Sequence, residues 1–211
     1  MTTAVIFDMD GLIIDSEPIH FEVDIETVNR FGARITHEEL ERFVGMTNPE
    51  MWKLIKDEYK LGHSVEEIID VQLAAKIRLL EQRAMEPIDG IRELLDGLKA
   101  NKVPIGLASS SPRSFIMAVL NKFGIAAYFD CVVSGEEVAR GKPAPDVFLE
   151  AASMLGVPPE SCIVVEDSRN GVAAAKAAGM KCYGFVNPNS GNQDLSAADW
   201  IVDSIRAIKP V

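Results

Sequence analysis

Short hydrophobic runs alternate with longer amphipathic segments along most of the chain. The runs cover residues 4–7, 104–108, 131–134, 162–166, 182–186 and 200–202. Runs of this length are typical of strands, and the segments between them have the apolar periodicity of helices. We therefore predict an α/β fold, with a doubly wound, mostly parallel sheet that carries helices on both faces.

Start and stop residues mark several of the predicted helices. Asp89 precedes one amphipathic segment, and Pro112 opens another that ends at Gly124. A third segment closes on Gly179. Polar residues and proline are common where helices begin, and glycine is common just after the last turn. These residues mark the start or the end of a helix in three of the connections between the predicted strands.

The connection between the first and second strands is much longer than the others. Crossovers of about 15 to 30 residues are usual, yet residues 8–103 separate these two runs. Helix signals fill the gap, including the capping boxes Thr36–Glu39 and Ser64–Glu67 and a helix start at Asn48. We predict that residues 16–84 form a helical cap domain, inserted into a core made of residues 1–15 and 85–211.

Composition and charge narrow the choice of partners and compartment. The chain has 211 residues, a net charge of −11 and no block of Lys or Arg, which argues against nucleic acid or an anionic membrane as a partner. No apolar run reaches the roughly 18 residues of a membrane span. The three cysteines, an odd number without a CxxC pair, predict buried free thiols. We expect a soluble protein of the reducing cytoplasm.

Polar residues follow four of the predicted strands. In an open parallel sheet the carboxyl ends of the strands form the ligand site. Several carboxylates would then share one crevice and would repel one another unless a divalent cation lay among them. An all-oxygen ligand set suits Mg²⁺. The candidate site residues are Asp8, Asp10, Ser109, Ser110, Lys142, Glu166 and Asp167.

The first acid pair suggests a division of chemical roles. A spacing of two in an extended segment points the side chains of Asp8 and Asp10 the same way. One carboxylate can hold metal and attack, while the other moves a proton. Lys142 and Ser109 supply the positive charge and hydrogen bonds that the oxygens of a phosphoryl group need. This set of residues indicates phosphoryl chemistry.

Each residue also has an ordinary structural explanation. The acid pair could form a turn, Lys142 could be a solvated surface residue, Ser109 could simply end a strand, and Glu166 with Asp167 could cap the next helix. Their joint placement at successive strand ends favours the functional interpretation.

Other motifs in the chain do not support a different chemistry. Residues 135–143 resemble a phosphate-binding P-loop, but they have one residue too many between the glycines and end in proline. The dinucleotide and serine-hydrolase fingerprints are absent from the sequence. Among the histidines, we expect His37 and His63 on the surface, whereas His20 follows the acid pair closely and is a candidate substrate-binding residue.

Four segments together resemble the haloacid dehalogenase superfamily of phosphotransferases. They read FDMDGLIIDSEP, LASSS, GKPAPDVFLEAASMLG and VVEDSRNGVAAAKAAGM, in the order and approximate spacing of that family. The resemblance spans essentially the whole chain. It is strongest to the subgroup with a small helical cap, which includes β-phosphoglucomutases and sugar-phosphate phosphatases.

The resemblance implies a role for each acid of the candidate site. Asp8 is similar to the nucleophile that becomes an aspartyl phosphate, and Asp10 to the acid/base that protonates the leaving group and then activates water. The implied Mg²⁺ ligands are Asp8, the backbone carbonyl of Asp10, and Asp167, with Glu166 as a direct or water-mediated fourth. The dehalogenase branch of the family lacks the second acid of the pair, so the resemblance implies phosphate chemistry and not dehalogenation.

The same resemblance implies how a phosphoryl group is bound. Ser109 corresponds to the hydroxyl that binds phosphate, and Ser110 is expected to add its backbone amide. Lys142 corresponds to the lysine that bridges phosphate and nucleophile. Asp8, Asp10 and Lys142 are thus the implied catalytic residues.

Two enzyme functions and one regulatory function are the alternatives to compare with these features. The first is a Mg²⁺-dependent phosphatase that acts on a small phosphorylated metabolite, a sugar phosphate, as a monomer. The second is a phosphosugar mutase, which needs a cationic clamp in the cap. Residues 45–51 contain no arginine, although Lys76 could substitute, and this favours net phosphate release. A receiver-like regulator would have neither the insertion nor the second acid.

Overall fold

The computed structural model describes residues 4–43 and 48–209. The chain divides into two compact units, one formed by Met1–Asp15 with Glu86–Val211 and the other by Ser16–Met85. We call them the α/β unit and the helical unit and describe each separately.

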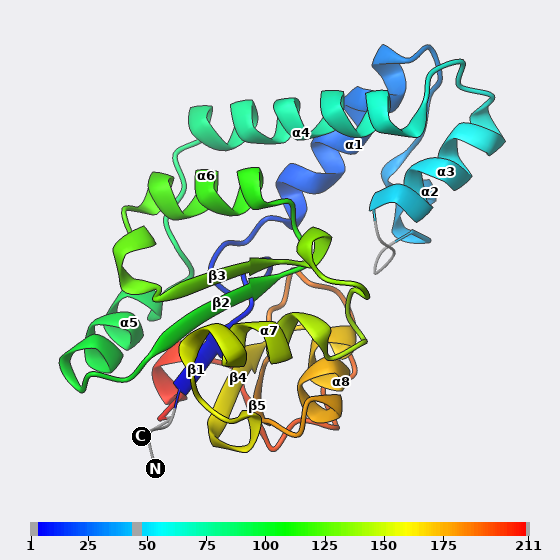
Figure 1. Cartoon of the computed structure of the whole chain (residues 1–211). Coiled ribbons are helices and arrows are strands. Elements are labelled where there is room, and N and C mark those ends of the chain that lie inside the picture. The colour runs from blue at the N-terminus through cyan, green and yellow to red at the C-terminus, as the bar shows by residue number, and fades with distance from the viewer. Residues whose placement is uncertain (1–3, 44–47, 210–211) are drawn as a thin grey trace. The chain divides into compact units, whose positions relative to one another are not determined.

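The α/β unit is built on a six-stranded sheet with the strand order β3-β2-β1-β4-β5-β6 (Figure 1). Every neighbouring pair is parallel, as the alternation of strands and helices predicted. Two strands lie one residue away from their predicted positions, which is within the usual uncertainty of strand ends. The strands are β1 Ala4–Phe7, β2 Ile105–Ser109, β3 Cys131–Ser134, β4 Cys162–Glu166, β5 Lys181–Phe185 and β6 Trp200–Val202.

Helices cover both faces of the sheet, which confirms the doubly wound fold. Figure 1 shows α7 (Asp146–Leu155) and α8 (Arg169–Ala177) on one face, with α5 (Ile91–Ala100) and α6 (Arg113–Phe123) on the other. Right-handed crossovers produce this division, because the chain moves from β1 towards β3 and then returns past β1 to β4 and β5. Strand β1 therefore lies at the centre, and all four of its residues are buried.

One hydrophobic core lies between the sheet and helices α7 and α8. Ala4 and Ile6 of β1 contribute to it from the sheet, and Val147 and Phe148 contribute from α7. Each fully buried Val, Ile or Phe side chain stabilises the fold by about 1.5–3 kcal/mol. This packing holds the carboxyl end of β1 in place, where the site residues follow.

The predicted helix limits are mostly observed. Helix α6 is bounded by Pro112 and by Gly124, which has a φ of 64°. For α5 the expectation of a polar cap was wrong, because its N-cap is Gly90 with a φ of 91°. The carboxylate of Asp89 instead accepts hydrogen bonds of 3.0 and 2.8 Å from Arg206.

The helical unit contains four helices among the described residues. They are α1 Glu17–Arg30, α2 His37–Glu41, α3 Asn48–Tyr59 and α4 Val65–Gln82. Both predicted capping boxes are present, at Thr36–Glu39 and at Ser64–Glu67. A hydrophobic core that includes Val28, Trp52 and Ile68 joins α1, α3 and α4.

A buried polar network crosses the helical unit. The side-chain amide of Gln72 donates to Asp24 at 2.5 Å, and that of Asn48 donates to Gln72 at 3.0 Å. The ammonium of Lys76 lies 3.7 Å from the same Asp24 carboxylate, and both side chains are nine-tenths buried. Lys76 is therefore paired within its own unit.

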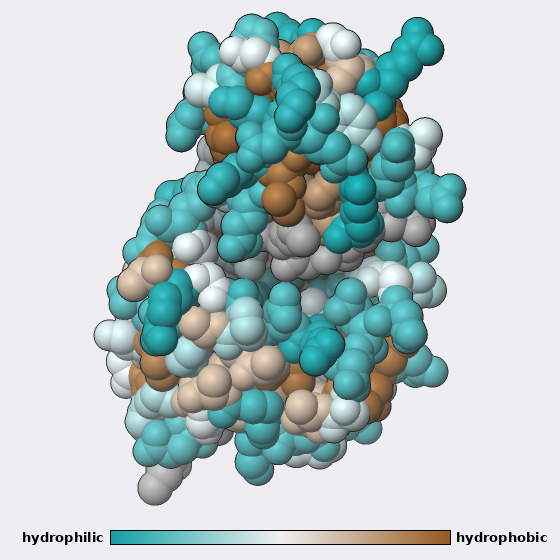
Figure 2. All heavy atoms as spheres, turned by 90° about the vertical axis from the view of Figure 1, so that its right-hand side faces the viewer, coloured by the Kyte–Doolittle hydropathy of each residue, from teal (hydrophilic) through white to brown (hydrophobic). Residues whose placement is uncertain are grey.

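The surface of the molecule is largely polar, and its cysteines are buried. The face shown in Figure 2 is mostly hydrophilic, with hydrophobic residues in small patches. Cys131, Cys162 and Cys182 are buried free thiols, as predicted. Burial raises the pKa of Cys131 and Cys162 to about 11, so both remain protonated at neutral pH. Among the described residues, no helix has both the length and the apolar character to cross a membrane.

Candidate active site

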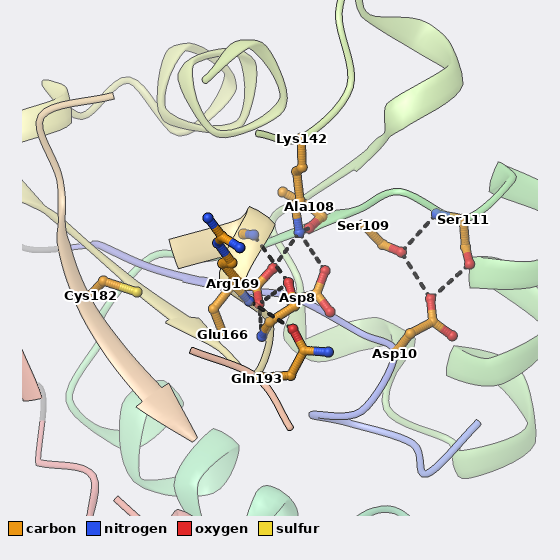
Figure 3. A network of polar contacts seen from close by, with 12 residues as sticks. Asp8, Asp10, Ala108, Ser109, Ser111, Lys142, Glu166, Arg169, Cys182 and Gln193 are labelled. Atoms are coloured by element: carbon orange, nitrogen blue, oxygen red, sulfur yellow. Dashed lines mark hydrogen bonds and ion pairs between the residues drawn. The ribbon is translucent and has the colours of Figure 1, made fainter. Parts of the chain in front are cut away.

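The parallel register brings the predicted site residues to one edge of the sheet. Phe7 of β1 pairs with Leu107 of β2 and with Val165 of β4, so the residues that follow these positions lie side by side. Asp8 comes directly after β1, and Glu166 is the last residue of β4. Figure 3 shows these acids together with Lys142, which reaches them from the segment between β3 and α7.

Lys142 is the centre of a buried ion-pair network. Its ammonium lies 2.5 Å from Asp8 Oδ1 and 2.8 Å from Glu166 Oε1, and it donates to the Ala108 carbonyl at 3.1 Å. Only 6% of the side chain is exposed, which rules out a solvated surface position. Burial by itself would lower the pKa of Lys142, but the two carboxylates outweigh burial and raise it. The side chain is therefore a fixed positive charge.

Three buried carboxylates surround this single ammonium. Oxygens of Asp8, Glu166 and Asp167 all lie within 4.8 Å of one another. The pKa of Asp8 is raised to about 8, chiefly by burial; Lys142 opposes this rise, while Glu166 and Asp10 add to it. Burial, followed by Glu166 and Asp8, likewise raises the pKa of Asp167. Three acids against one ammonium leave an excess of two negative charges when all are ionised.

A divalent cation is the simplest group that offsets this excess. The ligand atoms are all oxygens, which suits a hard cation such as Mg²⁺. A bound cation also reverses the pKa shift, because it favours the ionised form of each nearby carboxylate. The described residues of the cluster thus fit a Mg²⁺ site.

Asp10 lies apart from the acid cluster and binds hydroxyl groups instead. Its Oδ2 accepts a hydrogen bond of 2.7 Å from Ser111 Oγ and one of 3.3 Å from Ser109 Oγ. Figure 3 shows its carboxylate directed at these serines, whereas Asp8 faces Lys142. The chain forms turns at residues 11–13, directly after Asp10, so the extended segment on which the spacing prediction relied is short. The structure thus separates the two acids by their partners.

Gly11 allows the acid cluster to pack against the first turn. It has a φ of 75°, and a Cβ at this position would lie 2.0 Å from Asp167 Oδ2. The segment after β5 completes this contact: Ser190 Oγ donates to the same Asp167 oxygen at 2.5 Å, and Asn187 donates to the Gly11 carbonyl at 2.8 Å. Any side chain at residue 11 would displace Asp167.

Glu166 is held by both of its carboxylate oxygens. Oε1 accepts from Lys142, while Oε2 accepts from the backbone N–H of Ser168 at 2.6 Å and from its hydroxyl at 2.9 Å. Gly171 of α8 leaves room for this carboxylate, because a Cβ there would lie 1.5 Å from Oε1. The N-cap of α8 is Ser168, whose Oγ accepts from Gly171 N at 3.0 Å. The alternative that Glu166 or Asp167 caps this helix is therefore wrong.

The other residues considered in the sequence analysis are Ser110 and the three histidines. Ser110 is exposed between Ser109 and Ser111, and its use as an amide donor stays a prediction. His20 lies in the first turn of α1, in the helical unit, and its role also stays a prediction. His37 and His63 are exposed, as expected.

Sequence reasoning missed four polar residues next to the site. Ser111 ends the LASSS segment, in which the sequence predicts roles for Ser109 and Ser110 only, and Ser134 is the last residue of β3. Asn187 and Ser190 follow β5, a strand for which the sequence analysis predicts no site residue. The rule that ligands bind at strand ends, applied to all the strands, would have found Ser134 and Asn187.

Comparison with known proteins assigns this arrangement to a family. The haloacid dehalogenase-like hydrolase family matches residues 5–185. The chain belongs to this family. It is 32% identical to the phosphorylated carbohydrates phosphatase of Thermotoga maritima over 209 residues, which is 98% of this chain and 94% of the relative.

Solved structures of other haloacid dehalogenase-like proteins share the fold. CbbY from Rhodobacter sphaeroides in complex with phosphate superposes with a TM-score of 0.91 at 25% identity, covering 98% of this chain and 96% of the other. β-Phosphoglucomutase from Clostridium difficile superposes with a TM-score of 0.84 at 28% identity, covering 99% and 94%. The chain is thus similar over its whole length to proteins of this group.

Proposed function

We propose that this member of the haloacid dehalogenase-like family is a Mg²⁺-dependent phosphatase that hydrolyses a small phosphorylated metabolite, a sugar phosphate. The observation that carries the proposal is the buried pair of Asp8 and Lys142, joined at 2.5 Å beside Glu166 and Asp167. A nucleophilic carboxylate, a fixed ammonium and a set of metal-ligating oxygens are the groups that phosphoryl transfer through an aspartate requires. The phosphatase name of the Thermotoga maritima relative supports this proposal.

The acids have separate roles in the proposed site. Asp8, Asp167 and the backbone carbonyl of Asp10 would hold Mg²⁺, with Glu166 acting directly or through water. When bound, Mg²⁺ supplies positive charge that neutralises the acids and polarises a phosphoryl oxygen. Because Lys142 already occupies one oxygen of Glu166 and Ser168 the other, Glu166 suits the water-mediated position better.

The reaction proceeds in two displacements. A carboxylate oxygen of Asp8 attacks phosphorus, and the bond from phosphorus to the leaving oxygen breaks as protonated Asp10 gives that oxygen its proton. Ser109, the Ser110 amide and Lys142 bind the phosphoryl oxygens. A water molecule then attacks the phosphorus of the aspartyl phosphate and passes a proton to Asp10. The bond between phosphorus and the Asp8 oxygen breaks, so that phosphate is released and the Asp8 carboxylate is restored.

The helical unit decides between hydrolysis and a mutase reaction in our proposal. We propose that residues 16–84 act as a cap, whose closure would exclude water and select the substrate. Residues 45–47 of the segment 45–51 lie outside the described residues, but the sequence of this segment contains no arginine. Lys76, the alternative cation, is paired with Asp24 at 3.7 Å. This pairing argues against a free cationic clamp and favours net phosphate release.

The experiment is a phosphate-release assay on a panel of phosphorylated sugars. The panel includes β-glucose 1-phosphate supplied with a trace of the 1,6-bisphosphate, and both free phosphate and glucose 6-phosphate are measured. We expect Mg²⁺-dependent phosphate release that stops with chelator. Efficient formation of glucose 6-phosphate with little free phosphate would establish the mutase, an outcome that the similarity to β-phosphoglucomutase makes the natural alternative.

Partners and assembly follow from the same proposal. A net charge of −11 leaves local positive charge, such as Lys142, to bind an anionic substrate, and we propose no nucleic-acid or membrane partner. We further propose that the protein is cytoplasmic. We also propose that it is a monomer, because one chain supplies every group that the reaction uses. Light scattering on the purified protein tests the monomer directly.

A further inference from the structure

We infer that Ser134 is a positioning residue for the proton-transfer acid Asp10 and acts through Ser111. The inference rests on the proposed function, because it assigns a role within the same reaction. It concerns a residue on β3, two strands away from β1, that touches neither the acid cluster nor Asp10 in the described contacts.

Ser134 is fixed in place by its strand and by the turn that follows. It is the last residue of β3, it is fully buried, and it pairs in register with Ser109. Its backbone N–H donates to the carboxylate of Glu137 at 3.1 Å. Its hydroxyl donates to the backbone carbonyl of Ser111 at 2.7 Å. A rigid strand end therefore holds the backbone of the loop that follows β2.

This contact determines where the Ser111 hydroxyl lies. The carbonyl of Ser111 is bound to Ser134, and its N–H donates to Ser109 Oγ at 3.0 Å. With both sides of its backbone fixed, Ser111 places its own hydroxyl 2.7 Å from Asp10 Oδ2. The two segments also pack closely, because a Cβ at Gly135 would lie 3.1 Å from the Cα of Ser110.

Ser111 matters most when substrate is bound. A serine hydroxyl has a single proton to donate. In the proposed reaction Ser109 gives that proton to a phosphoryl oxygen, so it can no longer donate to Asp10 across 3.3 Å. Ser111 then keeps the Asp10 carboxyl aligned with the leaving group, and a small misplacement of a catalytic group can lower the rate strongly.

The Ser134 hydroxyl also caps the short helix Gly135–Glu137, where it accepts from Glu136 N at 3.2 Å. A cap needs only a lone pair of the oxygen, whereas the bond to Ser111 uses its proton, so both contacts coexist. The two roles predict different results on substitution. Loss of the cap alters stability, whereas loss of the bond to Ser111 alters proton transfer.

The test compares two substrates whose leaving groups differ in their need for a proton. A sugar phosphate has an alkoxide leaving group that must be protonated, whereas p-nitrophenyl phosphate releases a stable phenolate. We expect Ser134→Ala to lower kcat/KM for the sugar phosphate by roughly tenfold, a part of the 10²–10⁴ that a placed acid supplies. For p-nitrophenyl phosphate the change should stay below about threefold, because kcat/KM reports the first displacement only.

Control variants separate this role from a structural one. Asp10→Asn should show the largest preference for p-nitrophenyl phosphate over the sugar phosphate, and it sets the upper limit for the preference of Ser134→Ala. Glu137→Ala removes the acceptor of the Ser134 N–H and disturbs the same short helix, but the strand pairing with Ser109 still holds the Ser134 hydroxyl in place, so the ratio of the two rates should not change. Ser111→Ala should reproduce the preference of Ser134→Ala. The double variant should be no worse than Ser111→Ala, because both changes remove the same alignment.

The outcomes are distinct. Equal losses on both substrates for Ser134→Ala, or additive effects in the double variant, would overturn the inference and leave a structural role. Should Ser134→Ala fail to fold, the nearly isosteric Ser134→Cys replaces it. Because a thiol is a weak donor, this variant should show the same preference for p-nitrophenyl phosphate, but a smaller one. A ratio of kcat/KM values equal to that of the wild type would overturn the inference. If the wild type hydrolyses neither substrate, it is the proposed function that fails.

Discussion

Replacing Asp167 with asparagine should stabilise the protein in the absence of metal, although it removes a buried site residue. Asp167 shares the cluster with Asp8 and Glu166, with oxygens within 4.8 Å of one another. At an effective dielectric constant of about 20, two like charges at that distance repel by about 3.5 kcal/mol, so two such pairs give about 7 kcal/mol. Asparagine keeps the shape and can still accept the hydrogen bond from Ser190.

Protonation limits the gain. The wild type escapes the repulsion by protonating an acid, and holding a proton on a carboxyl at pH 7 costs about 4 kcal/mol relative to a pKa near 3.9. We therefore expect Asp167→Asn to raise the free energy of unfolding in chelator by about 2–4 kcal/mol, measured by urea denaturation at neutral pH. The exposed Asp203→Asn is the matched control and should change stability by less than about 0.5 kcal/mol.

Adding Mg²⁺ should reverse the order of the two proteins. The wild type gains stability with metal concentration, whereas Asp167→Asn has lost a ligand and gains less. A metal-free variant that is less stable than the wild type by about 2 kcal/mol or more would refute the reasoning, because it would mean that Lys142 alone balances the acids.

Three further predictions follow from the same contacts. Asp8→Asn should leave a folded protein whose turnover is reduced by roughly 10³-fold or more, because the amide keeps the shape and loses the nucleophile; a rate within about tenfold of wild type would remove Asp8 from that role. Ser190→Ala should weaken Mg²⁺ binding in calorimetry by roughly tenfold, since the hydroxyl that orients Asp167 is lost, and an unchanged affinity would show that the Gly11 contact alone orients this acid. In chelator, the stability difference between wild type and Asp8→Asn should move against the wild type as pH rises from about 4 to about 8. The pKa of Asp8 is raised to about 8 from 3.8, so the folded state binds more protons in that window; thermal melts that give a constant difference would contradict this.

The sheet and the acid cluster could be predicted because they depend on local patterns and on one rule of parallel sheets. The buried run Ala4–Phe7 and the run Cys162–Glu166 define two strands, and their register places Asp8 beside Glu166. The helical insertion was a prediction from the long gap between the first two runs and from the helix signals within that gap. For these features, knowledge of three-dimensional contacts was unnecessary.

The burial and partners of individual polar residues could not be predicted in this way. Lys142 belongs to a residue type that is usually exposed, and its burial depends on the path of the segment between β3 and α7. In the run Ser109–Ser111 the sequence does not say which hydroxyl turns towards Asp10, and the structure selects Ser109 and Ser111. Ser190 reaches Asp167 only because the segment after β5 returns to the first turn.

The aspartyl phosphate on Asp8 is the central claim, and trapping it is the most direct test. Asp10→Asn lacks the base that activates water, so with Mg²⁺ and p-nitrophenyl phosphate it should accumulate the intermediate. After an acid quench, peptide mass spectrometry should find one phosphoryl group on the peptide that contains Asp8, and none when chelator is present or when Asp8 is also replaced by asparagine. Release of nitrophenol by the same variant with an unmodified Asp8, or with the phosphoryl group on another residue, would contradict the proposed mechanism.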